Sequence, residues 1–128
     1  MRRFLIAIVI VAACGGAQRP RSSGMKELAA EIDAESAELA RIIHDLRDDC
    51  PRMATELKTL FARMKQSFDR AHAAQKDPAL AKELTTHLRA YDDIGKQRSA
   101  AMDADLTENP ACTQDPSVRE QMLVMPTL

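Results

Sequence analysis

The sequence predicts an all-α protein, a small helical bundle of three long helices and a short carboxy-terminal helix, closed by one disulfide. Three long segments carry apolar residues at helical spacing, and no window alternates apolar and polar residues as a strand does. Proline follows aspartate where the later helices are expected to begin, a pattern typical of helix starts. With 128 residues, of which 45% are hydrophobic, the chain is long enough for one domain.

The first helix is expected over residues 25–48. Its apolar residues are spaced by three, four or seven positions and therefore share one stripe: Leu28, Ile32, Leu39, Ile42 and Leu46. The same register places Glu35 on this stripe, so a carboxylate is expected on the seam between helices.

The second helix is expected over 51–76 and the third over 78–106. The apolar face of the second consists of Met53, Leu57, Leu60, Phe61, Met64 and Phe68, and that of the third of Leu80, Leu84, Leu88, Tyr91, Ile94 and Met102. Asp77 and Pro78 supply an N-cap and a first helical residue. The turn between the two helices is therefore tight, which predicts an antiparallel hairpin.

A short fourth helix is expected over 117–124. Asn109 and Pro110 end the third helix, and Asp115 and Pro116 begin the fourth. The last residues, 122–128, are apolar for a chain terminus. We expect them to cover one end of the bundle, and the alternative is that they dock on a partner.

The amino-terminal segment has the layout of a secretory signal. Arg2 and Arg3 precede ten apolar residues, 4–13, which is shorter than the roughly 20 needed to span a bilayer. Residues 11–14, Val-Ala-Ala-Cys, resemble the lipobox of bacterial lipoproteins. The resemblance implies that the signal peptide, 1–13, is removed and that Cys14 is lipidated. Gly15, where that family's inner-membrane retention signal would be acidic, favours the outer membrane.

The resemblance covers only the start of the chain, and composition describes the remainder. Residues 15–24 are rich in Gly, Ser and Arg, so 14–24 is expected to be a lipidated flexible tether to a domain formed by 25–128. Removing Arg2 and Arg3 lowers the count of Lys and Arg from 18 to 16 against 19 Asp and Glu, a formal charge of −3. No basic excess remains, so nucleic acid is not an expected partner. Acyl chains are expected to provide the membrane attachment.

Two cysteines remain once Cys14 carries lipid. Cys50 directly precedes the second helix, and Cys112 follows the third. In an antiparallel hairpin these two positions lie at the same end, and exported compartments permit disulfides. The sequence therefore predicts a Cys50–Cys112 bond, and the alternative is two unpaired thiols.

The sequence contains no Gly-rich phosphate loop, HExxH, CxxC or GxSxG motif, and we expect neither an enzyme nor a bound cofactor. The favoured interpretation is a periplasmic, membrane-anchored lipoprotein that binds another envelope protein or supports an assembly. One alternative is a small haem or copper carrier. In the predicted hairpin His87 and Met64 are about one turn apart in level, and Met with His resembles the axial ligation of cytochrome b562-type bundles and suits copper.

Overall fold

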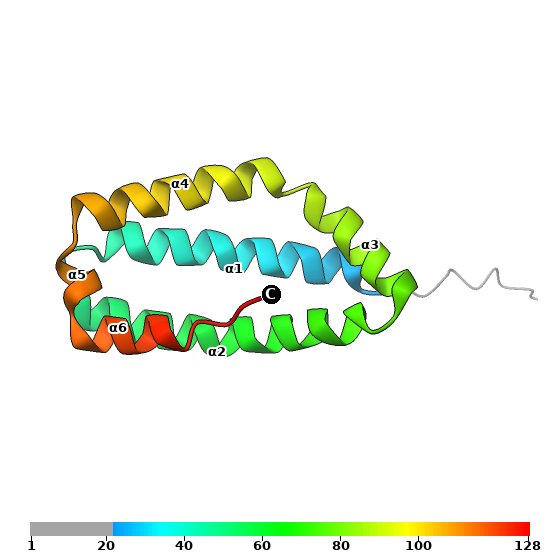
Figure 1. Cartoon of the computed structure of the whole chain (residues 1–128), viewed down its shortest axis with the longest axis horizontal. Coiled ribbons are helices and arrows are strands. Elements are labelled where there is room, and N and C mark those ends of the chain that lie inside the picture. Colours follow the sequence, from blue (N-terminus) through cyan, green and yellow to red (C-terminus); the bar gives the residue numbers. More distant parts are fainter. Residues whose placement is uncertain (1–21) are drawn as a thin grey trace, which may run out of the picture.

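The computed structural model describes residues 22–128, so the predicted signal peptide, Cys14 and most of the tether lie outside the described residues. Within this range the chain is helical without strands. It forms α1 (Met25–Asp45), α2 (Cys50–Gln75), α3 (Pro78–Arg89), α4 (Asp92–Glu108), α5 (Ala111–Gln114) and α6 (Pro116–Leu123). The helices lie along one long axis, with the α2–α3 turn at one end and α5 at the other (Figure 1).

The antiparallel pair α1 and α2 is the centre of the fold (Figure 1). All six apolar residues predicted for the face of α2 are buried, and so are four of the five on the α1 stripe. Asp49 caps α2 by accepting from the amide of Arg52 at 3.2 Å, and Pro51 stands in its first turn. Asp77 caps α3 in the same way, accepting from the amides of Ala79 and Leu80. The sequence therefore predicts this part of the fold correctly.

The core consists of two apolar clusters separated by a buried polar pair. The larger cluster lies between α1 and α2 from Leu39 and Phe68 towards the disulfide, and the smaller one joins the opposite ends of α1 and α2 to α3. Glu35, only 5% exposed, lies between them. Its Oε2 accepts a hydrogen bond of 2.5 Å from the hydroxyl of Ser67, which is fully buried. The expected carboxylate on the seam is therefore present and has a donor.

The predicted third helix over 78–106 is wrong as a single element, because the structure has two helices there. The amides of Ala90 and Tyr91 donate to carbonyls three residues back, at 3.3 and 3.0 Å, which tightens the last turn of α3 and ends it. Asp92 and Asp93 then form the first turn of α4. Aspartate is a poor residue within a helix but is favoured at an amino-terminal end, so a break here is better than a continuous helix.

Helix α4 packs on α1 and has no buried side chain of its own. Ile94, which belongs to the apolar face predicted for a single helix, lies after the break and is exposed. Met102 and Leu106 are partly buried and pack against the larger core cluster, and polar contacts also attach the helix. Arg98 holds both carboxylate oxygens and the backbone carbonyl of Asp33, and His44 Nδ1 lies 3.1 Å from Asp105 Oδ2.

The disulfide joins the carboxy-terminal segment to the start of α2. The Sγ atoms of Cys50 and Cys112 are 2.09 Å apart, as the sequence predicts, and Cys112 is buried in the larger core cluster. Helix α5, which carries Cys112, is a short element that the sequence pattern does not indicate. Helix α6 begins at the predicted Asp115–Pro116 step and packs along α2 rather than across the end of the bundle (Figure 1).

Candidate binding site

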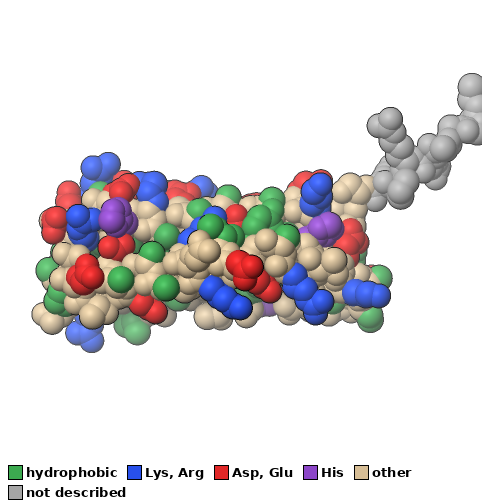
Figure 2. All heavy atoms as spheres, turned by 90° about the horizontal axis from the view of Figure 1, so that it is seen from above, with side chains coloured by type: hydrophobic (Ala, Val, Ile, Leu, Met, Phe, Trp, Pro, Cys, Tyr) green, Lys and Arg blue, Asp and Glu red, His purple; other side chains and the backbone are tan. Residues whose placement is uncertain are grey.

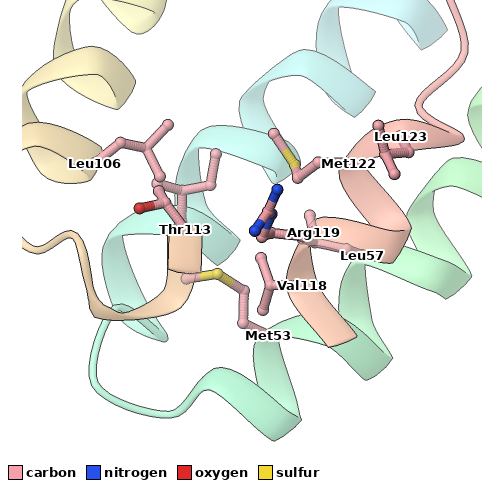
Figure 3. Close-up of a pocket in the computed structure, with 9 residues that line it drawn as sticks. Met53, Leu57, Leu106, Thr113, Val118, Arg119, Met122 and Leu123 are labelled. Atoms are coloured by element: carbon pink, nitrogen blue, oxygen red, sulfur yellow. The ribbon is translucent and has the colours of Figure 1, made fainter. Parts of the chain in front are cut away.

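A pocket of about 320 Å³ lies where α5 and α6 meet α1, α2 and the end of α4 (Figure 3). Its lining is almost entirely apolar and consists of Ile43, Met53, Leu57, Leu106, Val118, Met122 and Leu123, with Thr113 and Arg119 as the polar members. The floor is part of the larger core cluster, whereas Leu106 and Met122 are only partly buried. The pocket therefore extends from the core to the surface.

Two features hold the wall formed by α5 and α6 in place. The disulfide fixes Cys112 beside the start of α2. Asp115 then caps α6, because its Oδ1 accepts from the amides of Ser117 and Val118 at 3.0 and 3.2 Å. The hydroxyl of Ser117 donates to the same oxygen, and these hydrogen bonds hold the pKa of Asp115 below its usual value of 3.8. Val118 is buried as a consequence and anchors α6 on the core.

Arg119 is the charged side chain of the pocket lining. Its side chain is exposed, and Figure 3 draws the guanidinium beside Met122. None of the ion pairs between residues 22 and 128 involves Arg119. Asp115, one turn earlier on α6, directs its carboxylate to its own helix. The site therefore combines an apolar interior with a cation that lacks an ion-pair partner within the described chain.

Beside the pocket the chain leaves large apolar side chains in solvent. Leu123 is 87% exposed and Val124 64%, and Met125 and Leu128 are also exposed. The prediction that residues 122–128 cover one end of the bundle is therefore wrong. Val118 and Met122 pack on the core, but the residues after them are left uncovered.

A second, wider hollow lies between α1 and α4. It is partly polar, with Ile32 and Tyr91 beside Asp33 and Lys96, and Leu128 reaches its edge. On the face in Figure 2, acidic and basic side chains alternate along the length of the molecule. That face lacks the single-sign region that an electrostatic docking surface would require.

The structure places the two candidate ligands for haem or copper in different surroundings. Met64 belongs to the apolar core cluster of α1 and α2. His87 is about one-third exposed on α3, and its Nε2 lies 4.0 Å from Glu83 Oε1. Within residues 22–128, no group of three or more His, Cys, Asp or Glu side chains is arranged to hold a metal ion. The His87–Met64 pair stays a prediction without a supporting contact.

Sequence reasoning does not find the pocket, because its walls come from segments far apart in the chain. Leu57 on α2 and Leu106 on α4 meet Met122 only after α3 has broken and α5 has turned the chain. One local signal is present in the sequence. Arg119 stands directly after Val118 and three residues before Met122, so a cation borders the apolar face of a short helix.

Comparison of the chain with family models, with curated proteins and with solved structures finds no match in any of the three. In the range 22–128, no helix has the length and apolar character needed to cross a membrane.

Proposed function

We propose that the chain is a non-enzymatic envelope lipoprotein, anchored through lipid on Cys14, whose helical domain binds another envelope protein. The observation that carries the binding role is the exposed apolar segment 123–125, which begins at the last residue of α6. Leu123, Val124 and Met125 are consecutive and exposed, beside a pocket that opens to the surface. Contiguous exposed apolar residues mark interaction sites far more often than isolated ones do.

Ion pairs between α1 and α2 give several charged side chains a structural role. Arg63 pairs with Glu38, and Arg41 pairs with Glu56, so these carboxylates link α1 to α2. Such pairs hold the helices in position, so these charged groups have a structural role. A haem or copper carrier remains the alternative, and no geometry within residues 22–128 favours it over a binding module.

The arrangement of the helices also suits a tethered binding module. Helix α1 begins at one end of the bundle, whereas α5 and the start of α6 lie at the other end (Figure 1). The pocket is lined by residues of α5 and α6 together with α1, α2 and α4. Helix α1 has 21 residues, which corresponds to a length of about 30 Å. A tether that enters at residue 24 would therefore join the domain at the end opposite α5.

Site-specific photo-crosslinking in cells tests the binding role. A photoreactive amino acid at Leu123 should give a discrete crosslinked protein, and one at Ile94 should not. Ile94 is the matched control because it is also a large, exposed apolar side chain but lies alone on α4. The product should disappear when Val124 is changed to Ser. Equal products from both positions, or none above background, would contradict the proposal.

The anchor has a separate test. Cys14→Ser should abolish acylation, signal cleavage before position 14 and fractionation with membranes, because each depends on the cysteine in lipobox proteins. A Cys14→Ser chain that is processed and sediments like the wild type would exclude the lipoprotein assignment. The crosslinking result would stand independently.

A further inference from the structure

The pocket beneath α6 has the chemistry of an amphiphile site. Its floor is built from buried apolar side chains, among them Met53, Leu57 and Val118. Its rim carries the exposed side chain of Arg119 and Thr113, whose hydroxyl donates to the carbonyl of Pro110 at 2.7 Å. A ligand that fits both regions has an apolar body and one polar end.

The positive charge of Arg119 at the rim favours a ligand with a negatively charged end. Asp115, four residues before Arg119, directs its carboxylate to the amides that begin α6. Arg119 therefore has no acidic partner within the described chain. The planar guanidinium fork matches the two oxygens of a carboxylate, which makes a carboxylate the best-matched polar end.

The size of the pocket restricts the apolar body. A volume of about 320 Å³ is at the low end of the range for small-molecule sites, which begins near about 300 Å³. One flexible alkyl chain fits such a space, whereas a helix of a protein partner needs a row of anchor pockets along a groove. Leu106 and Met122, which are partly buried, leave an opening through which the chain can enter.

We propose that this pocket binds a single-chain aliphatic carboxylate, a medium-chain fatty acid anion, with its carboxylate on Arg119 and its chain over Leu57 and Met53. This site goes beyond the proposed protein-binding function and does not depend on it. The exposed segment 123–125 could bind a protein whether or not the pocket is filled.

Calorimetric titration of the purified full chain with hexanoate, octanoate and decanoate tests the proposal. The affinity should rise about fourfold for each added methylene group until the pocket is full, because each buried methylene group contributes a constant increment. Octanoate should bind about tenfold or more tightly than octanol, since a hydrogen bond to a charged group exceeds one to a neutral group. Acetate, which has the head without the chain, should not bind measurably.

Two variants assign the effects to the pocket. Arg119→Gln should remove the preference for octanoate over octanol while keeping the dependence on chain length. Met122→Trp should fill the pocket and abolish binding of all the acids, with circular dichroism confirming that the chain is folded. Arg89→Gln, an exposed arginine on α3, is the matched control and should bind like the wild type.

Three results would overturn the proposal. They are equal affinities for octanoate and octanol, an affinity independent of chain length, and an acid preference that survives Arg119→Gln. Each would show that the site does not recognise an amphiphilic carboxylate.

Discussion

Removing the Cys50–Cys112 disulfide should cost the protein a large part of its stability. The bond closes a loop with a sequence separation of 62 residues. The chain-entropy estimate for a loop of that length is about 4 kcal/mol at 25 °C. Domains of this size have unfolding free energies of about 5–15 kcal/mol. The double variant Cys50→Ala, Cys112→Ala should therefore fold only marginally.

Equilibrium unfolding in urea, followed by circular dichroism, measures this effect directly. The wild type and the double variant should differ by about 4 kcal/mol, which corresponds to a fall in Tm of about 15–30 °C for a domain of about 100 residues. Adding a reductant should weaken the wild type to the level of the variant and leave the variant unchanged. Alanine is chosen because Cys112 is buried and a serine hydroxyl there would add its own cost. A difference below about 1 kcal/mol would refute the loop-closure reasoning.

Three further perturbations have defined outcomes. Ser67→Ala should lower the free energy of unfolding by about 1–3 kcal/mol, because the buried carboxylate of Glu35 loses its hydrogen-bond donor. The double variant Ser67→Ala, Glu35→Leu should be as stable as the wild type or more stable in the same urea experiment. Arg98→Ala should remove the contact with Asp33 and speed hydrogen exchange of the α4 amides, while the exchange rates of the α2 amides stay unchanged. Exchange rates in α4 equal to those of the wild type would contradict the role of Arg98 in attaching α4. Because the pKa of Asp115 is lowered on folding, its carboxylate stabilises the protein above about pH 4, and this contribution is lost as the pH falls through the folded pKa. Stability measured between pH 5 and pH 2 should therefore fall more steeply for the wild type than for Asp115→Asn.

The sequence predicts those parts of the fold that depend on local chemistry. The α2 face from Met53 to Phe68 follows from its spacing, because one continuous helix buries one continuous stripe. Asp77 and Asp115 start helices where an aspartate precedes a proline. The cysteine pairing is predicted correctly because α3 and α4 together return the chain to the end where α2 begins, although α4 packs on α1 and not on α2 as the predicted hairpin requires.

Other features depend on competition between distant parts of the chain. The apolar period from Leu80 to Met102 continues across the break and predicts one helix. Tyr91 packs against the smaller core cluster, and the acidic pair after it begins a new helix, so the break is fixed by packing together with charge. The uncovered position of Leu123 could not be predicted either. Whether the last residues are buried depends on the position of α6 along α2, and the disulfide and α5 together determine that position.

The buried contact between Glu35 and Ser67 has a consequence for how α1 and α2 find their alignment. Much of their interface consists of Leu, Ile, Met and Ala, and such surfaces could slide past one another by a turn with little change in buried apolar area. A slide of one turn would set Glu35 opposite Met64 or Ala71, neither of which has a side-chain donor, and would separate the ion pairs Glu31–Arg70 and Glu38–Arg63 on either side. The stranded carboxylate would cost about 1–3 kcal/mol or more. The buried hydrogen bond, together with the ion pairs between α1 and α2, therefore favours the native alignment over shifted ones that bury a similar apolar area.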